Sequence, residues 1–190
     1  MLKTVILDAG HGGIIDGIYQ TSGKRSPMWP DGSQLFEGEF NRAIKARLIE
    51  RLTAANIRYI DINPESLDIS LNTRVTRANK IKNAFLVSIH SNAGGGIGSE
   101  IFISENASKT SQKIAATAQT EYKKVFEGKK WRGIKKKNFT MIYKTVCPAV
   151  LFECFFMDNK QECKDILLTK QGRDLCADWI YNTIEKTMYI

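Results

Sequence analysis

Two apolar segments of this chain each end at a histidine, and these are the only histidines among its 190 residues. The first reads Val5-Ile-Leu-Asp-Ala-Gly-His11-Gly-Gly13, and the second reads Phe85-Leu-Val-Ser-Ile-His90-Ser-Asn-Ala93. Short apolar runs that break into small or polar residues are typical of buried strands in an α/β sheet, where binding sites lie at the carboxyl ends of strands. Neutral imidazoles placed there bind zinc. The pattern predicts two strand ends that share a metal; the alternative is two unrelated histidines.

The composition is that of a single globular domain. With 190 residues, 43% of them hydrophobic and 25% charged, the chain is long enough for one core. No apolar run approaches the roughly 20 residues of a membrane span. The gaps of seven, nine and thirteen residues between the cysteines exclude a Cys-x-x-Cys motif. We expect one domain over residues 1–190, no membrane partner, and reduced core cysteines at Cys147, Cys154, Cys163 and Cys176.

The chain is also strongly basic. Its formal net charge is +8, and six of the nine residues from Lys129 to Lys137 are basic. Such a charge favours polyanionic partners such as nucleic acid or anionic wall polymers. Few aromatic residues are interleaved with these lysines and no nucleic-acid motif is present, so we expect no nucleic-acid partner. The basic segment is predicted to be a loop, either solvated or holding anionic groups.

Hydrophobic periodicity predicts strands that alternate with helices. Residues 12–36 are rich in Gly, Ser, Pro and Asp, which predicts a loop of unusual length for a compact domain. The alternation predicts an α/β domain with a mostly parallel or mixed sheet covered on both faces. We expect helices over 37–55, 70–83, 108–127 and 170–186, and strands over 3–8, 58–62, 84–90, 99–104, 139–143 and 149–156.

A catalytic zinc needs a third protein ligand besides two histidines, and it keeps one position open for water. A carboxylate at the start of the first long helix is the best candidate, because a helix N-terminus favours negative charge. Glu37 opens that helix directly after the loop that leaves His11, but Glu39 lies nearby and spacing alone does not exclude it. Position favours Glu37, whose alternative role is a plain glutamate stabilised by the helix dipole.

A second carboxylate, Glu153, lies within the apolar segment 148–156. A charge inside a buried strand is unfavourable unless it is paired or functional. As a general base near a metal, Glu153 would have its pKa raised toward neutrality by burial. The alternative is an ion pair with a lysine or arginine at the strand end. Zinc and one such carboxylate suffice for amide hydrolysis, and no Gly-x-Ser-x-Gly motif indicates a serine nucleophile.

Five sequence motifs occur in order along nearly the whole chain. They are Asp8-Ala-Gly-His-Gly-Gly13; Glu37 followed by Asn41; Leu71-x-x-Arg74-x-x-x-Ala78-Asn79 with Ser88-Ile-His-Ser-Asn-Ala93; Arg132-Gly-Ile-Lys135; and the stretch from Pro148 to Asn159 that contains Glu153. In this order they resemble the motifs of the zinc-dependent N-acetylmuramoyl-L-alanine amidases. These are catalytic domains that cleave peptidoglycan and include phage endolysins.

The resemblance implies that His11, Glu37 and His90 hold one zinc ion and that Glu153 is the catalytic acid/base. It implies hydrolysis of the amide bond between the lactyl group of N-acetylmuramic acid and the L-alanine of the stem peptide. Peptidoglycan is then the substrate, and cell-wall lysis or remodelling is the outcome. The resemblance also implies a twisted, mostly parallel sheet of about six strands with helices on both faces.

Substrate contacts are expected at Asn92, Arg132 and Lys135, where the two basic residues would hold carboxylates of stem peptides or of anionic wall polymers. One position departs from the family, because Phe155 stands where a glycine is usual. Its ring is expected to narrow the site or to shift the local backbone. The 12–36 segment is expected to be either a wall of the substrate groove or an ordinary surface loop.

No wall-binding domain is expected beside the catalytic unit. No signal peptide is visible either, since the first apolar run is about five residues long and is interrupted by Asp8. This predicts a phage lysin that stays in the cytoplasm until lysis, or a secreted bacterial enzyme represented by its catalytic part.

Two other functions fit parts of the sequence. A zinc peptidase that cuts bonds within stem peptides would use the same metal and glutamate. A non-catalytic module that binds an anionic polymer would use the positive charge, but it gives no reason for the order of His11, Glu37, His90 and Glu153.

Overall fold

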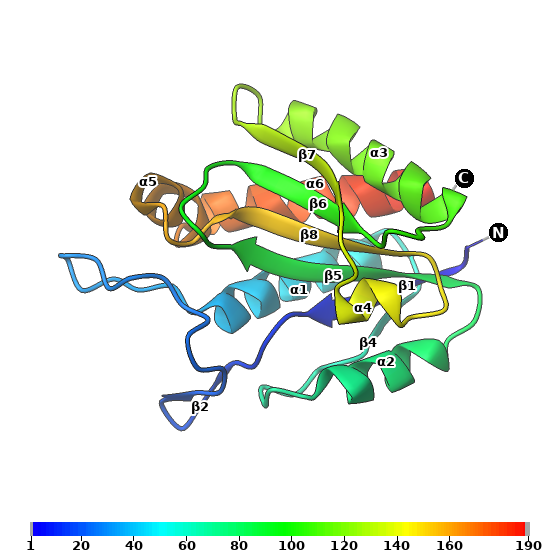
Figure 1. Ribbon diagram of the computed structural model, residues 1–190, viewed down its shortest axis with the longest axis horizontal. Coiled ribbons are helices and arrows are strands. Elements are labelled where there is room, and N and C mark those ends of the chain that lie inside the picture. Colours follow the sequence, from blue (N-terminus) through cyan, green and yellow to red (C-terminus); the bar gives the residue numbers. More distant parts are fainter. Residues whose placement is uncertain (1, 189–190) are drawn as a thin grey trace.

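A six-stranded sheet runs through the middle of the computed structural model, which describes residues 2–188 (Figure 1). Its strand order is β4-β1-β5-β8-β6-β7, and all neighbours are parallel except β6 and β8. The mostly parallel six-stranded α/β fold is therefore confirmed. The strands are β1 (Thr4–Ala9), β4 (Tyr59–Asp61), β5 (Ala84–Asn92), β6 (Ser99–Ile103), β7 (Trp131–Lys136) and β8 (Ala149–Phe156).

Helices cover both faces of the sheet, as expected. One face carries three long helices, α1 (Glu37–Ala54), α3 (Lys109–Val125) and α6 (Lys170–Thr187). The other carries α2 (Leu71–Asn79) and the short α4 (Thr140–Tyr143). A single turn, α5 (Lys160–Glu162), and a π-helix, η1 (Cys163–Leu167), connect β8 to α6.

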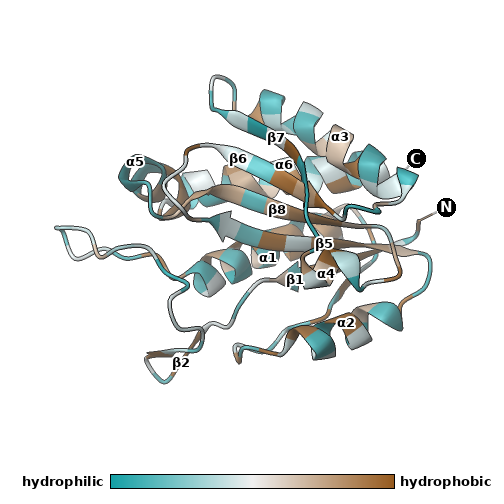
Figure 2. Cartoon of the chain, viewed as in Figure 1, coloured by the Kyte–Doolittle hydropathy of each residue, from teal (hydrophilic) through white to brown (hydrophobic). Residues whose placement is uncertain are grey.

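The side chains of each strand alternate between the two faces of the sheet, and each face is covered by helices, so the protein has two hydrophobic cores. Val5 and Leu7 face the three long helices, whereas Ile6 between them faces α2 and α4. The larger core includes the fully buried Trp179, whose indole N–H donates to the carbonyl of Ala118 at 2.7 Å. Figure 2 shows brown, hydrophobic stretches on the central strands β5 and β8 and teal, hydrophilic stretches on the helices and on β7. Burial on both faces explains why the central strands are nearly continuous apolar runs.

Two predictions about the segment before β8 were wrong. The basic segment 129–137 is not a loop, because residues 131–136 form the edge strand β7, parallel to β6. Lysines suit such an edge, since their charge discourages pairing with another chain. Residues 139–143 are not a strand but the helix α4, in which Met141 and Ile142 pack into the smaller core. The apolar pattern of residues 139–143 is too short to distinguish the two-residue period of a strand from the 3.6-residue period of a helix.

The 12–36 segment is folded against the body of the protein. It contains a small antiparallel hairpin of β2 (Ile14–Ile15) and β3 (Ile18–Tyr19), and further along Arg25 forms an isolated antiparallel bridge with Phe36. Its Trp29 indole N–H lies 3.4 Å from the thiol of Cys163. All four cysteines are free, as expected. Among the described residues, no helix has the length and apolar character needed to span a bilayer.

Candidate active site

The carboxyl ends of β1, β5 and β8 lie side by side at one edge of the sheet and carry three of the predicted site residues. Ala9 of β1 stands opposite Ile89 of β5, so His11 follows β1 at the level of His90. His90 stands directly opposite Glu153 of β8. The tertiary structure thus brings together residues 142 positions apart in the chain, counting from His11 to Glu153.

Glu37 lies between the two imidazoles. Its Oε2 is 3.2 Å from Nε2 of His11, and its Oε1 is 3.0 Å from Nδ1 of His90. One donor atom from each of the three residues lies within 4.8 Å of the others. The two rings are nearly perpendicular, at 88°, with centroids 5.1 Å apart. Two imidazole nitrogens and a carboxylate oxygen that converge in this way form a group able to hold a metal ion.

The two glutamates in the first turn of α1 have different surroundings. Glu37 is the first residue of the helix, and its N–H donates to the carbonyl of Lys24 at 2.9 Å. Glu39 instead accepts a hydrogen bond from the backbone N–H of Ile14 at 2.7 Å, which ties the small hairpin to α1. Only Glu37 therefore belongs to the donor group.

Electrostatics within this group keep Glu37 ionised. Burial alone would raise the pKa of Glu37, but hydrogen bonds with His11 and His90 outweigh it and hold the pKa well below its usual range. At His90, burial alone would lower the pKa of the imidazole, but the Glu37 carboxylate outweighs burial and raises that pKa. The acid of the donor group is thus a carboxylate over the whole neutral range.

Glu153 is a different kind of carboxyl group. Burial raises its pKa to about 8, against a smaller opposing effect of His90. Its Oε2 is buried with no hydrogen-bond partner in the described part of the chain. Among the same residues no lysine or arginine lies within ion-pair distance of Glu153, and the charge of Lys24 lowers its pKa only slightly. A neutral-range carboxyl with a free oxygen is suited to taking and returning a proton.

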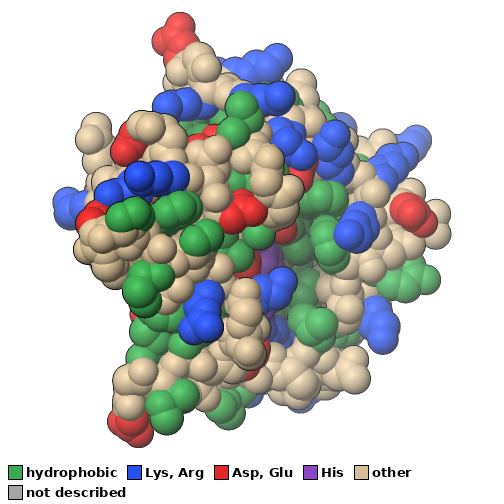
Figure 3. Space-filling model, turned by 60° about the vertical axis from the view of Figure 1, so that its left-hand side comes forward, with side chains coloured by type: hydrophobic (Ala, Val, Ile, Leu, Met, Phe, Trp, Pro, Cys, Tyr) green, Lys and Arg blue, Asp and Glu red, His purple; other side chains and the backbone are tan. Residues whose placement is uncertain are grey.

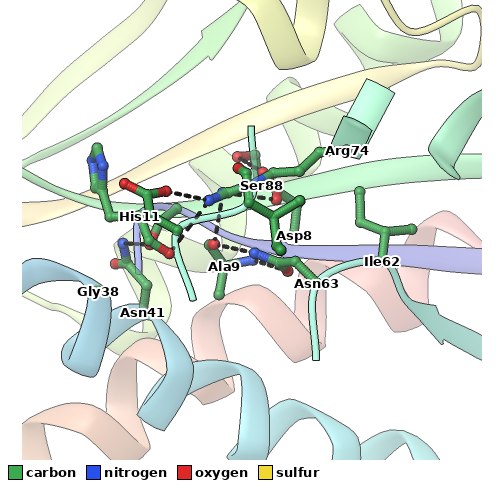
Figure 4. Close-up of polar contacts among 12 residues, drawn as sticks. Asp8, Ala9, His11, Gly38, Asn41, Ile62, Asn63, Arg74 and Ser88 are labelled. Carbon is green, nitrogen blue, oxygen red and sulfur yellow. Dashed lines mark hydrogen bonds and ion pairs between the residues drawn. The ribbon is translucent and has the colours of Figure 1, made fainter. Parts of the chain in front are cut away.

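The backbone of His11 is held in an unusual conformation. Its φ of 65° lies in the left-handed region, which non-glycine residues rarely adopt. Arg42 donates to the carbonyl of His11 at 2.8 Å, and Arg74 donates to the same oxygen at 3.4 Å. Asn41 donates to the carbonyl of the preceding Gly10 at 3.0 Å (Figure 4). Such strain costs roughly 1–3 kcal/mol and persists because the surroundings hold it.

Arg74 connects the two strands that end at the histidines. Its guanidinium is 2% exposed, donates to the carbonyl of Ala9 at 3.0 Å, and pairs with Asp68 at 2.9 Å and with Asp8 at 3.3 Å. Asp8 in turn accepts a hydrogen bond from the hydroxyl of Ser88 on β5 at 2.7 Å (Figure 4). The polar network therefore fixes β1 and β5 relative to each other just before their histidines.

Glycine is required where the backbone passes the donor group. A Cβ added at Gly10 would lie 2.1 Å from Cε1 of His90, so any side chain there would displace the imidazole. A Cβ at Gly38, just after Glu37, would lie 1.7 Å from the carbonyl oxygen of Gly12. Close packing of the loop after β1 against α1 and β5 thus depends on these two positions.

The donor group opens into a cavity of about 460 Å³. Glu153 lines it together with His11, Glu37 and His90. Figure 3 shows the histidine colour at the bottom of a hollow, with hydrophobic, acidic and basic side chains around it. The apolar part of the wall consists of Leu71, Phe139, Met141, Leu151 and Met157. A site of this kind offers a polar reaction centre beside a surface for apolar groups.

The sequence matches a known enzyme family over nearly its whole length. A family model described as N-acetylmuramoyl-L-alanine amidase matches residues 5–186. The chain belongs to this amidase family. Both the expected family and the expected fold are confirmed.

Three relatives illustrate the similarity in sequence and in structure. The endolysin of Bacillus phage SPP1 is 32% identical over 169 residues, which are 85% of this chain and 58% of the endolysin. The uncharacterized protein YqiI of Bacillus subtilis (strain 168) is 27% identical over 96% of this chain and 84% of its own length. The crystal structure of an N-acetylmuramoyl-L-alanine amidase from Clostridium difficile 630 superposes with a TM-score of 0.83 at 26% identity, covering 98% of this chain and 96% of that one.

The predicted substrate-binding residues of the amidase domain lie in different places. Asn92 lines the cavity, and its amide donates to Glu100 at 2.6 Å. Arg132 also pairs with Glu100, at 3.0 Å, and its guanidinium lies over the ring of Phe156. Lys135 is exposed on β7, and neither it nor Arg132 is among the residues that line this cavity. Their substrate contacts stay a prediction.

Phe155 does not enter the cavity. Its φ of 52° explains why a glycine is usual at this position of the family, since that conformation suits glycine best. The ring is fully buried in the larger core, 4.9 Å from the ring of Phe126. The expectation that it narrows the site is therefore wrong, and a shift of the local backbone relative to the family stays a prediction.

Two residues at this cavity were missed at the level of sequence. Lys24, from the 12–36 segment, and Lys137, from the connection between β7 and α4, both line it. Neither belongs to a family motif quoted above, and only the path of the chain places them at the site.

Proposed function

We propose that this chain is a zinc-dependent hydrolase of the amide bond between N-acetylmuramic acid and L-alanine in peptidoglycan. His11, Glu37 and His90 would hold one zinc ion, and Glu153 would be the catalytic acid/base. The observation that carries the proposal is the convergence of three donor atoms within 4.8 Å of one another, with Glu153 in register beside His90. Membership of the amidase family supplies the bond that is cut.

The chemistry of the donor group fits a zinc ion. Two imidazoles and one carboxylate leave a position for water in a tetrahedral site. The low pKa of Glu37 provides the deprotonated ligand that metal binding requires. The Glu153 oxygen without a partner lies in the same cavity. When bound, zinc would polarise the scissile carbonyl and lower the pKa of a water molecule.

Glu153 performs the proton transfers in this proposal. Its position opposite His90 places the carboxyl group beside the donor group, on the same face of the sheet. As a carboxylate it accepts the proton of the attacking water, and as an acid it returns that proton to the nitrogen of the departing L-alanine. A nearby cation favours the carboxylate form, so metal loading would bring its pKa down from about 8.

The test is the identity of the bond cut in purified cell wall. The zinc-loaded wild type is expected to release stem peptides with a new N-terminal L-alanine from glycan strands. New termini inside the stem peptide instead would show a zinc peptidase and refute the amidase assignment. Binding of the wall without any cleavage, with or without zinc, would favour the non-catalytic module.

Two variants separate metal binding from proton transfer. Glu153→Gln should keep a full zinc complement and lose at least about 100-fold in kcat, because it cannot shuttle the proton. His90→Ala should lose both zinc and activity, since two ligands hold the ion poorly. Zinc content measured by atomic emission alongside turnover decides the assignment. Full turnover by Glu153→Gln, or full zinc in His90→Ala, would contradict these roles.

The cell wall is the expected place of action, in line with the endolysin and amidase relatives. Release during phage lysis or secretion, and contacts with anionic wall polymers, remain predictions.

A further inference from the structure

Two lysines border the cavity of the proposed active site, and neither forms a salt bridge within the described part of the chain. Lys24 and Lys137 are both exposed residues that line the cavity. The ammonium group of Lys137 lies 4.7 Å from the centroid of the Phe139 ring. An ammonium without an anionic partner, beside a pocket, is available to a ligand.

Other basic residues near the site are already neutralised. Arg132 pairs with Glu100 at 3.0 Å. Arg74 is buried between two aspartates. The positive charge that remains at the cavity therefore belongs to Lys24 and Lys137, and not to the Arg132 segment that the sequence indicated.

The backbone of Lys24 is tied to the helix that supplies Glu37. Its carbonyl accepts hydrogen bonds from the N–H of Glu37 and from the hydroxyl of Tyr19, both at 2.9 Å. The same Tyr19 oxygen accepts the N–H of Gly38 at 2.9 Å. The bridge between Arg25 and Phe36 closes the segment behind it. Lys24 is thus held at a defined place beside the donor group, whereas a free surface loop would leave it mobile.

The backbone of Lys137 is also held in place by hydrogen bonds. Its N–H donates to the carbonyl of Ile103 at 3.0 Å, and its carbonyl accepts the N–H of Phe139 at the same distance. In Figure 1 the chain leaves β7 at this point and crosses the face of the sheet to reach α4. Phe139 lines the cavity below the ammonium group. The cavity therefore combines an apolar wall with two cationic side chains.

We propose that Lys24 and Lys137 form a carboxylate-binding subsite for the peptide portion of the substrate. The ligand would be the free α-carboxylate of the residue that follows L-alanine, and the apolar wall would contact the alanine methyl and its neighbours. This inference rests on the proposed amidase function. It makes the enzyme selective for stem peptides with a free α-carboxylate over those in which it is amidated.

The experiment uses two synthetic muramoyl tripeptides that differ in one group. In one the second residue is D-glutamate with a free α-carboxylate, and in the other it is the α-carboxamide. The zinc-loaded wild type is compared with Lys24→Met, Lys137→Met and the double variant. Lys135→Met is the matched control, because it removes the same charge from an exposed lysine that does not line the cavity.

The wild type should favour the free acid by about 10-fold in kcat/KM, the size of one charge-assisted hydrogen bond. Lys24→Met and Lys137→Met should lose this preference, so that the ratio of kcat/KM for the acid to kcat/KM for the amide falls toward 1. Lys135→Met should keep it. Equal loss on both substrates, or no preference in the wild type, would overturn the subsite.

Calorimetric binding of the two peptides to zinc-loaded Glu153→Gln separates the subsite from the reaction. If the wild type cleaves neither peptide, the proposed function fails. In that case the subsite is still supported if the acid peptide binds Glu153→Gln more tightly than the amide peptide does. Adding Lys24→Met or Lys137→Met to Glu153→Gln should then abolish this difference in affinity. The subsite falls when the two peptides bind equally.

Discussion

At the scale of single residues, the site depends on two carboxyl groups with opposite environments. Glu37 sits between two imidazoles that hold its pKa well below the usual range, whereas burial raises the pKa of Glu153 to about 8. Pairs of carboxyl groups whose environments separate their pKa values commonly take separate roles in catalysis. Here one is suited to a permanent ligand and the other to a proton carrier.

The raised pKa of Glu153 predicts a pH-dependent stability in the metal-free protein. An unfolded glutamate ionises near pH 4.3, whereas folded Glu153 stays protonated until about pH 8. Wild type should therefore lose stability relative to Glu153→Gln as the pH rises through this window, by up to about 1.4 kcal/mol per pH unit. The difference should level off above about pH 8 and vanish below about pH 4.

Urea unfolding of both proteins in chelator, at pH values from 4 to 9, measures this difference. Parallel stability profiles for wild type and Glu153→Gln would show that burial does not perturb Glu153.

At the scale of secondary-structure elements, the histidine strands are aligned by a polar network from α2. Arg74 on that helix pairs with the fully buried Asp8 on β1, which accepts a hydrogen bond from Ser88 on β5. Each histidine follows its anchor by two or three residues. The strained turn at His11 is held by the same guanidinium. α2 thus contributes no proposed ligand and still determines where two of the proposed ligands lie.

Arg74→Met is expected to destabilise the metal-free fold by about 3–5 kcal/mol, because it leaves Asp8 buried without its partner. Arg77→Met on the same helix is the control. Arg77 pairs with Glu65 near the surface, where both side chains are more than a third exposed, so solvent screens the pair and its loss should cost far less. Denaturant unfolding measures both, and equal losses would contradict the role given to Arg74.

At the scale of the whole molecule, the proposed metal ion would link segments that are far apart in the sequence and that the fold brings close together. The donors come from the loop after β1, the start of α1 and the end of β5. An ion bound by all three links the two central strands to a helix on one face of the sheet. Binding should therefore stabilise the folded domain as a whole.

Zinc at about 1,000 times its dissociation constant should add about 4 kcal/mol to stability and raise Tm by about 8–16 °C in a domain of this size. The unfolded chain offers two histidines and four cysteine thiols, and zinc bound to them would reduce this shift. His90→Ala should show no such shift. Differential scanning calorimetry with and without zinc measures the change, and an equal shift in both proteins would indicate binding elsewhere.

The sequence by itself determined the elements and the chemistry of the proposed site. Apolar runs ending at His11 and His90, an amphipathic helix opening at Glu37, and a carboxylate within the last strand are local patterns that need no knowledge of the fold. The segment between the basic residues and β8 was assigned wrongly. Its apolar residues are too few to show a period, and burial against the smaller core decides that α4 is a helix.

Only the tertiary structure decided which groups face the site. Parallel pairing in register places Glu153 opposite His90, and the packing of α1 turns Glu37, and not Glu39, toward the imidazoles. Lys24 and Lys137 reach the cavity from segments with no shared pattern, while Arg132 is taken up by Glu100 and Phe155 turns into the core. A local sequence pattern specifies period and residue type, whereas partners far along the chain set direction and pairing.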